Sequence, residues 1–502
     1  MEEYKLRPGA RARELLEGFL VEYGLAPGDR LPSERALSQR WGLSRSTLRN
    51  ALSLMEEDGT LRSRIGAGTF VAPAKYTRSL QGLLSMSQSA AGQGRTVTTR
   101  LLRLEQAECD KHLAKRFGQM LGYPLYKIVR LRSVDGEPVM IETSYIPAGR
   151  VPGLEKKDLE HQSLFAILEE DYGVIPREGD EKIGITYATD EEAALMGVEP
   201  ESPLFWIVST TYDQGGQMME YCRAAARPDR LRITTVMERK LEGAITEYEM
   251  TKLWAPSPPL YLQLRELIRS KIENGEYPPG TAIPSVGTLA EKYGIHRLSV
   301  RSAISALIGE GLLKSVQGKG IFVVGEKLEQ DLETVGGFEQ TLKASAKHFE
   351  QRLLVKASRT AGPLYASWLN CLAEEPLYYV KRLSLLDGEP LSLEEAYIPQ
   401  WLVPNLADVD LNVFPLHEVY EFYGIHLLRG EQSLGITRLD SPDARLLDVD
   451  PRRGVLTLQC VRYGSPERAD GAPAGPGDEQ PVEFTRTHIR ADKCDLSVHF
   501  HR

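Results

Sequence analysis

The chain has 502 residues and a formal net charge of −9. Because this length exceeds what one hydrophobic core supports, it indicates about three or four domains. Its hydrophobic fraction is 42%. The N-terminal sequence MEEYKLRPGA lacks the apolar segment of a secretion signal. No apolar run of about 18 residues occurs, which argues against a membrane span. The cysteines are odd in number and widely spaced, which argues against a disulfide framework or zinc ribbon and favours a reducing cytoplasm; they are Cys109, Cys222, Cys371, Cys460 and Cys494.

Two helices are predicted before residue 43. The first is amphipathic and ends at the turn Pro27-Gly28. The second is predicted to start at Ser33, whose hydroxyl can cap backbone N–H groups, and to end at the Gly42 turn.

A third helix and a β-hairpin follow. Ser44 is placed to cap the helix, whose apolar residues recur at helical spacing from Leu48 to Met55. Strands are predicted at residues 60–63 and 69–71, on either side of a glycine-containing turn. This order of elements is typical of a helix-turn-helix followed by a wing. We call residues 1–75 the first head.

The next domain, residues 80–240, contains both strands and helices. Strands at residues 126–133 and 139–145 flank Asp135-Gly136, which is a strong hairpin signal. A helix is predicted at residues 165–172, and further strands at 203–212 and 218–224. This mixture predicts an α+β fold. We call it the first large domain.

The whole arrangement then repeats with an offset of about 252 residues. After a proline-containing linker at residues 241–259, residues 283–304 repeat the pattern of residues 31–52. The Asp135-Gly136 hairpin recurs at Asp387-Gly388. The chain is therefore predicted to contain a second head at residues 260–326 and a second large domain at residues 332–495. A Gly- and Pro-rich insertion at residues 465–480 is predicted to be a mobile surface loop.

The heads resemble the DNA-binding head of the GntR family of bacterial transcription regulators. The resemblance rests on the PSE, SR-x-T-x-R-x-AL and G-x-GTFV elements, which occur in this order in the first head. The large domains resemble the UTRA effector domain of the HutC subfamily, through DGEP, the Y-I-P strand end and VEF or MEY. The resemblance implies an α+β chain with two winged helix-turn-helix heads, each followed by a chorismate-lyase-like UTRA domain.

For the first head, the resemblance implies contacts with double-stranded operator DNA from the second and third helices and the wing tip. The guanidinium group of arginine can form two hydrogen bonds to the edge of a guanine base. Hydroxyl groups and the N–H groups at a helix start can bind phosphate oxygens, and glycines let the wing approach the DNA backbone closely. The residues concerned are Arg35, Ser44, Arg45, Ser46, Thr47, Arg49, Gly66 and Gly68. A solvated helix face is the alternative interpretation of such arginines.

The second head departs from this pattern. Gly287 replaces Arg35, and Leu298 replaces Ser46 at an exposed helix start. It keeps candidate DNA contacts at Arg297, Ser299 and Arg301, and it gains Lys319 in the wing. Three roles stay open for this head: binding a different half-site, binding DNA weakly, or serving only in packing.

The resemblance also implies an effector pocket for a small anionic metabolite of the sugar phosphate or small carboxylate class. Alternating arginines on one strand share a face and form an anion clamp, while the glutamates suit hydroxyls or an amine. The matching residues are Arg130, Arg132, Glu142, Ser163 and Glu220 in the first copy, and Arg382, Glu394 and Glu483 in the second. Internal ion pairs are the alternative interpretation. Ser384 replaces Arg132 in the second copy, and Phe414 is assigned to the place of Ser163.

The sequence thus favours a cytoplasmic, ligand-responsive DNA-binding regulator, and more specifically a repressor. The two copies are expected to pair within one chain as a pseudo-dimer, with a homodimer of four heads as the variant. An enzyme or a scaffold that does not bind DNA is the alternative, but no catalytic motif, metal-ligand spacing or cofactor fingerprint occurs. His499 and His501 are expected to lie in a frayed tail rather than a metal site.

Overall fold

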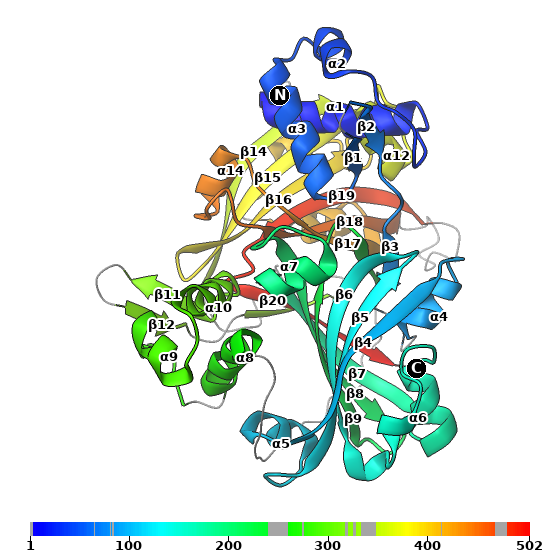
Figure 1. Ribbon diagram of the computed structural model, residues 1–502. Coiled ribbons are helices and arrows are strands. Elements are labelled where there is room, and N and C mark those ends of the chain that lie inside the picture. The colour runs from blue at the N-terminus through cyan, green and yellow to red at the C-terminus, as the bar shows by residue number, and fades with distance from the viewer. Residues whose placement is uncertain are drawn as a thin grey trace. The chain divides into compact units, whose positions relative to one another are not determined.

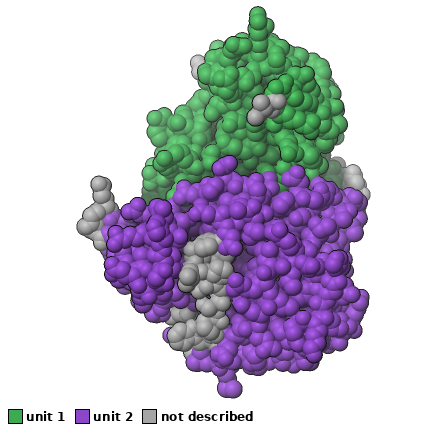
Figure 2. Space-filling view, viewed as in Figure 1, with its two compact units in different colours: residues 1–77, 228–241, 331–490 green, residues 78–227, 242–330, 491–502 purple. Residues whose placement is uncertain are grey.

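The computed structural model describes residues 4–64, 66–80, 82, 85–238, 260–273, 276–316, 320–324, 328–332, 348–412, 414–466 and 479–501. The predicted linker, Lys319 and most of the predicted insertion lie outside these residues. Figure 1 shows the elements, and Figure 2 colours two compact units. Unit 1 comprises residues 1–77, 228–241 and 331–490, and unit 2 comprises residues 78–227, 242–330 and 491–502.

The first head belongs to unit 1 and has the predicted winged helix-turn-helix order. Its elements are α1 (Pro8–Glu22), α2 (Glu34–Trp41), α3 (Arg45–Glu57), β1 (Leu61–Arg64) and β2 (Gly68–Val71). The predicted caps are confirmed: the Ser33 hydroxyl accepts from the Ala36 N–H, and the Ser44 hydroxyl accepts from the Thr47 N–H. Gly42 ends α2 with φ +63°, a left-handed conformation that glycine adopts without strain.

The second large domain also belongs to unit 1 and is built on an eight-stranded sheet in the order β14-β15-β16-β19-β18-β17-β10-β3. Its strands are β14 (Phe349–Thr360), β15 (Pro376–Leu386), β16 (Glu389–Pro399), β17 (Ile425–Thr437), β18 (Val455–Pro466) and β19 (Gln480–Ile489), joined by β10 (Leu231–Glu238) and β3 (Tyr76–Ser79). Its helices are α12 (Gly362–Leu369), the 3-10 turn η3 (Leu406–Asp408), α13 (Leu416–Phe422) and α14 (Ser441–Leu446).

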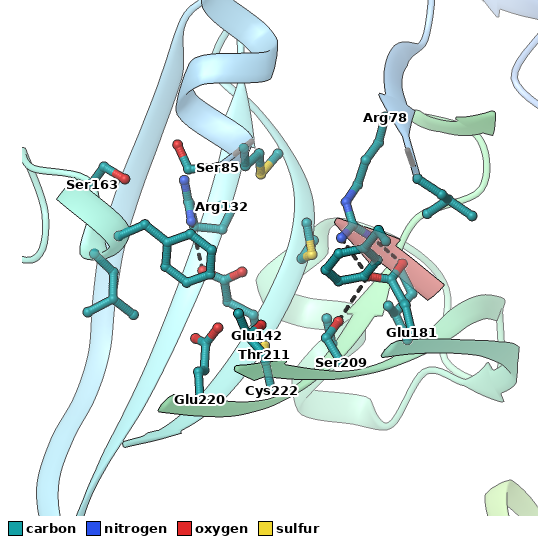
Figure 3. A pocket seen from close by; sticks show the side chains of 18 of the residues that line it. Arg78, Ser85, Arg132, Glu142, Ser163, Glu181, Ser209, Thr211, Glu220 and Cys222 are labelled. Carbon is teal, nitrogen blue, oxygen red and sulfur yellow. Dashed lines mark hydrogen bonds and ion pairs between the residues drawn. The ribbon is translucent and has the colours of Figure 1, made fainter. Parts of the chain in front are cut away.

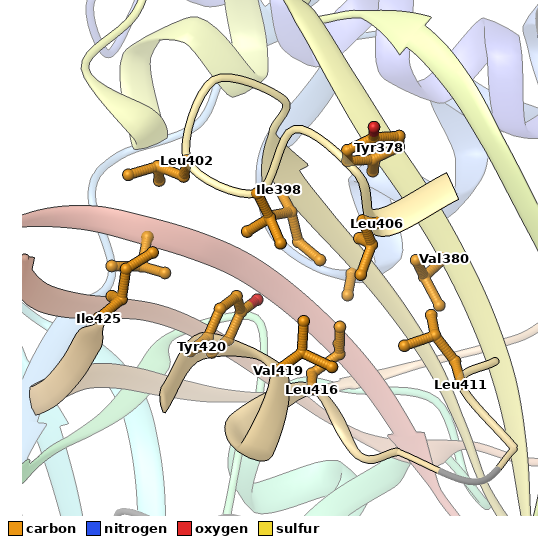
Figure 4. Packing of buried hydrophobic residues seen from close by; sticks show 13 residues of the cluster. Tyr378, Val380, Ile398, Leu402, Leu406, Leu411, Leu416, Val419, Tyr420 and Ile425 are labelled. Atoms are coloured by element: carbon orange, nitrogen blue, oxygen red, sulfur yellow. The ribbon is translucent and has the colours of Figure 1, made fainter. Parts of the chain in front are cut away.

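A buried cluster holds α13 against this sheet (Figure 4). Leu416, Val419 and Tyr420 of the helix pack among strand residues such as Val380 and Ile398. Each large apolar side chain that is fully buried contributes about 1.5–3 kcal/mol. The packing therefore fixes where the side chains of α13 lie relative to the sheet.

The second head belongs to unit 2 and repeats the architecture of the first. Its elements are α8 (Leu260–Glu273), α9 (Val286–Tyr293), α10 (Arg297–Gly309), β11 (Leu313–Val316) and β12 (Gly320–Val323). Apolar residues of the three helices and the wing form one core, which includes Leu264, Leu289, Val300 and Leu313.

The first large domain completes unit 2 with a second eight-stranded sheet, in the order β13-β20-β7-β8-β9-β6-β5-β4. Its strands are β4 (Val97–Glu108), β5 (Pro124–Val134), β6 (Glu137–Pro147), β7 (Pro176–Tyr187), β8 (Pro203–Asp213) and β9 (Met218–Ala226), joined by β13 (Leu328–Asp331) and β20 (Cys494–His501). Its helices are α4 (Met86–Ala91), α5 (Lys111–Phe117), α6 (Leu164–Tyr172) and α7 (Asp190–Met196), with the 3-10 turns η1 (Ala148–Arg150) and η2 (Leu154–Lys156).

The two sheets exchange strands between the halves of the sequence. The strand β10 follows the first large domain in the chain but pairs with β17 of the second, from Ile233 opposite Leu434 to Glu238 opposite Arg429. The strand β20 follows the second large domain but pairs with β7 of the first. Each exchanged strand satisfies the backbone hydrogen bonds of an edge that would otherwise be exposed.

This exchange changes two expectations. Each head packs with the large domain of the other half, so the compact units differ from the head-plus-domain repeat in the sequence. The prediction of a frayed tail was wrong, because residues 494–501 form β20 and the Nδ1 of His499 lies 2.7 Å from an Asp180 carboxylate oxygen.

Charged side chains join α1 to the second large domain in unit 1. Glu17 of α1 accepts from Arg486 at 3.3 Å and from Arg13 at 2.7 Å. Glu14 accepts from both terminal nitrogens of Arg359. The Tyr4 ring stacks on that of Tyr379 with 4.4 Å between centroids.

The corresponding joint in unit 2 uses different charges. Arg265 of α8 donates to Glu192 of α7 at 3.0 Å. Arg269 pairs with Glu310 of the same head at 2.5 Å, and Glu310 accepts from Thr186 of β7 at 2.7 Å. The guanidinium of Arg269 also lies 4.2 Å from the centroid of the Trp206 ring. Arg269 matches Glu17 by the 252-residue offset, so the two joints have opposite charges at the same helix position.

Candidate functional site

The start of α3 presents an exposed polar surface on the first head. Arg45 and Ser46 are exposed, and Thr47 is half-buried. The hydroxyl of Ser44 lies 2.9 Å from that of Ser46 and 2.7 Å from that of Thr47. The positive end of the helix and this group of hydroxyls together suit a phosphate oxygen.

The remaining candidates of the first head flank this surface. Arg35 of α2 is exposed. Arg49 is exposed and pairs with Glu34 at 2.7 Å through Nε and one terminal nitrogen, which leaves its other terminal nitrogen outside this pair. Gly66 and Gly68 in the wing have φ of +75° and +111°, and only glycine adopts such values freely.

The second head presents a less polar version of the same surface. Arg297 and Arg301 are exposed and Ser299 is half-buried. Val286 stands in the place of Glu34, so Arg301 lacks the carboxylate that holds Arg49. Leu298 is 65% exposed at the start of α10, an apolar side chain where the first head has Ser46.

A cavity of about 120 Å³ opens on one face of the sheet in unit 2 (Figure 3). The structure brings all five effector candidates of the first large domain to its walls: Arg130, Arg132, Glu142, Ser163 and Glu220. Arg130 and Arg132 alternate along β5 and Glu142 lies opposite on β6, so the three share one face as the strand period requires.

A buried ion cluster forms one wall. Nitrogens of Arg130 and Arg132 lie 2.7 Å and 2.8 Å from the same oxygen of Glu142. Burial raises the pKa of Glu142, but the two guanidinium groups outweigh it and hold that pKa below its ordinary value. A guanidinium has five N–H donors, so one contact with the shared Glu142 oxygen leaves further donors on each arginine for an anion. The internal ion pair and the anion clamp are thus compatible.

Glu220 and Ser163 line other parts of the cavity. Glu220 is buried, and burial raises its pKa above the ordinary value because Ser144 and Arg130 offset the burial only in part. Ser163 precedes the first residue of α6, and its side chain makes no capping hydrogen bond to the helix. The N-terminus of a nine-residue helix therefore adjoins the cavity.

Several lining residues escaped the sequence analysis. Arg78 makes a bidentate pair with Glu181, both contacts being 2.6 Å, and Ser209 donates to Glu181 at 2.9 Å. Ser85 comes from the cap of α4, and Phe500 from the exchanged strand β20. The alternation of Leu496, Val498 and Phe500 was the available signal for this strand, but it does not identify the partner strand.

The second large domain arranges its candidates differently. Arg382 pairs with Glu394 and also donates to Gln351 at 2.9 Å. Glu483 is fully buried and pairs with Arg462. The residue before α13 is Pro415, as Ser163 is the residue before α6, so the assignment of Phe414 to that place was wrong by one position.

None of the helices within the described residues combines the length and apolarity that a membrane crossing needs. A model of the UTRA domain matches residues 92–232 and 344–470. A model of bacterial regulatory proteins of the gntR family matches residues 8–71 and 260–323. Both domains therefore occur twice, in alternation.

Among similar proteins, the HTH-type transcriptional repressor NagR of Bacillus subtilis (strain 168) is 33% identical over 43% of this chain and 88% of NagR. The mannosyl-D-glycerate transport/metabolism system repressor MngR of Escherichia coli (strain K12) is 27% identical over 39% of this chain and 82% of MngR. The crystal structure of PhnF from Mycobacterium smegmatis is 32% identical, covers 46% of this chain and all of PhnF, and has a TM-score of 0.35. These relatives are transcription regulators rather than enzymes. The chain belongs to the GntR family, as a tandem duplication of the HutC-like form, and is a ligand-responsive DNA-binding transcription regulator.

Proposed function

We propose that the chain is a repressor in which one polypeptide does the work of a dimer, and that a small anionic metabolite bound in the cavity of unit 2 controls its affinity for operator DNA. The observation that carries the proposal is the convergence of the two arginines, the glutamates and a helix N-terminus on that cavity. The protein would act in the bacterial cytoplasm, where its operator lies.

The effector would be a sugar phosphate or a small hydroxy-carboxylate. The guanidinium groups of Arg130 and Arg132 suit a phosphate or carboxylate, since charge-assisted bidentate contacts bind such groups strongly. Glu220 lies in the same cavity and suits sugar hydroxyls or an amine. The name of MngR contains a sugar carboxylate, which agrees with this class.

Covalent linkage would replace dimerisation. Two heads in one chain have a high effective concentration for neighbouring half-sites, so operator binding would not require a second chain. The effector would act by binding one arrangement of the heads more tightly than the other, because only a difference in affinity shifts such an equilibrium.

Thermal unfolding with a panel of sugar phosphates and hydroxy-acids tests the effector class. A metabolite present at 100 times its Kd stabilises the native state by about 2.7 kcal/mol. We expect at least one compound to raise the Tm of the wild type and to lose this effect in Arg130→Ala. Arg100→Ala, on the neighbouring strand β4 but absent from the cavity wall, is the matched control. A compound that stabilises Arg130→Ala as well as the wild type contradicts the anion clamp.

Binding to the chain's own promoter region, measured at several salt concentrations, tests the DNA function. Sequence-specific binding should persist at salt concentrations that remove nonspecific binding. Equal affinity for promoter and scrambled DNA contradicts the proposal.

A further inference from the structure

The two large domains differ at one pair of strands beside the candidate effector site. In unit 2, Thr211 on β8 lies opposite Glu220 on β9. In unit 1, the corresponding strands place Arg462 on β18 opposite Glu483 on β19. A short hydroxyl side chain in the wall of the open cavity thus corresponds to a long cationic side chain in the second copy.

Arg462 satisfies the carboxylate that the sequence pattern assigns to an effector. Its guanidinium pairs with one oxygen of Glu483, while the Tyr420 hydroxyl donates to the other oxygen at 2.5 Å. Both Glu483 and Tyr420 are fully buried, and the Arg462 side chain is 15% exposed. Figure 4 shows Tyr420 on α13 within the core.

The second donor is also specific to this copy. By the 252-residue offset, Tyr420 corresponds to Leu168, which offers no hydroxyl to Glu220. Glu220 therefore has a threonine and a leucine where Glu483 has an arginine and a tyrosine. The raised pKa of Glu220, which follows from burial, agrees with a carboxylate whose charge is only partly compensated.

The neighbouring candidates in unit 1 are engaged as well. Glu394 pairs with Arg382, whose other terminal nitrogen is bound to Gln351. With Ser384 in the place of Arg132, one arginine serves one glutamate here, whereas two serve one in unit 2. The second guanidinium that suits an anion in unit 2 is therefore missing from these matching positions.

We propose that Arg462 is a built-in substitute for the ligand: its guanidinium occupies the effector position of the second large domain, and each chain takes up its effector only in the cavity of unit 2. This inference rests on the proposed function for the identity of the cavity. It makes the chain a regulator with two heads but one sensor, in which unit 1 is held permanently in its internally paired state.

The role of Arg462 can be tested without knowledge of the effector, by removing its guanidinium group and adding a free guanidinium compound in its place. Arg462→Ala should leave Glu483 buried without its cation, and breaking such a pair should lower the Tm by about 6 °C or more. Ethylguanidinium should then bind in the vacated space and restore about half of that loss at ten times its Kd. Ethylammonium lacks the planar fork and should restore less.

The wild type and Arg452→Ala serve as controls, since Arg452 forms only an exposed pair with Asp450. Neither should be stabilised by ethylguanidinium. A folded Arg462→Ala variant that gains no more from ethylguanidinium than these controls overturns the inference. That result leaves the proposed function intact, because the unit 2 cavity is unaffected.

The reciprocal substitution tests the inference should Arg462→Ala fail to fold. Thr211→Arg places the same cation opposite Glu220, and it should fold and abolish the thermal shift given by the stabilising metabolite. Thr211→Ser, which keeps the hydroxyl, should retain the shift. A Thr211→Arg variant with an undiminished shift overturns the inference. A wild type that binds two equivalents of metabolite per chain overturns it as well.

Discussion

Unit 1 and unit 2 are built from the same repeated sequence, but they differ in the head surface and in the candidate effector site that each contains. Unit 1 combines the head with the more complete set of candidate DNA-binding residues and a large domain in which Arg462 pairs with Glu483. Unit 2 combines the altered head, with Leu298 exposed at its helix start, and the large domain with the open cavity. Under the proposed function, DNA recognition is therefore strongest in unit 1 and ligand recognition is confined to unit 2.

The largest effect on DNA binding is expected from substitutions in the heads. Each good bidentate base contact contributes about 1–3 kcal/mol of discrimination. We expect Arg45→Ala and Arg49→Ala each to reduce the preference for promoter over scrambled DNA by about 10- to 100-fold. The matched substitutions Arg297→Ala and Arg301→Ala should have smaller effects, confined to one half-site.

Fluorescence anisotropy with full and half operators measures this difference. Equal losses from the matched substitutions in the two heads would show that the heads contribute equally. No loss from Arg301→Ala would assign the second head to packing alone.

A change in stability, rather than in DNA binding, is expected at the joint in unit 1. Glu17→Arg would place a cation beside Arg13 and Arg486, in place of the carboxylate that now pairs with both. Loss of a largely buried pair should lower the free energy of unfolding by about 2–4 kcal/mol. Denaturant unfolding measures the change, and Glu421→Arg on the exposed surface is the charge-matched control.

The double variant Glu17→Arg with Arg486→Glu should recover part of this stability, because it restores opposite charges. A Glu17→Arg protein as stable as Glu421→Arg contradicts the account of the joint.

The smallest effect concerns Glu220 and pH. Burial raises the pKa of this carboxyl in the folded state, so its contribution to stability is present below its ordinary pKa and is lost as pH rises through the raised value. Glu220→Gln should therefore raise the Tm of the ligand-free protein at pH 8 by about 2 °C. The gain should shrink towards pH 5.

Glu199→Gln, an exposed counterpart, should change the Tm by less than this at either pH. A gain for Glu220→Gln that does not depend on pH would show that the charge of Glu220 is not the cause.

Local chemistry made much of this molecule predictable. Ser33, Gly42 and Ser44 act within one turn of their partners, and the Asp135-Gly136 hairpin brings together adjacent strands. The alternation of Arg130 and Arg132 along a single strand is enough to place both on one face. Such features depend on neighbours along the chain, so the sequence alone is sufficient.

The rest depended on contacts between distant segments. The exchange of β10 and β20 is invisible to periodicity, because alternation predicts a strand but not the edge with which it pairs. Arg78 and Phe500 reach the cavity through that topology. The repeat aligns Arg462 with Thr211, but the position of Arg462 opposite Glu483 depends on the register of β18 and β19, which the sequence does not specify across the insertion at residues 465–480.

Operator affinity in the presence and absence of the stabilising metabolite tests the central claim most directly, with Arg130→Ala compared with its counterpart Arg382→Ala. If unit 2 is the sensor, the metabolite changes the affinity of the wild type and of Arg382→Ala by about tenfold, a coupling of about 1.4 kcal/mol. The same metabolite then leaves the affinity of Arg130→Ala unchanged. A response that Arg382→Ala loses and Arg130→Ala keeps would contradict the account.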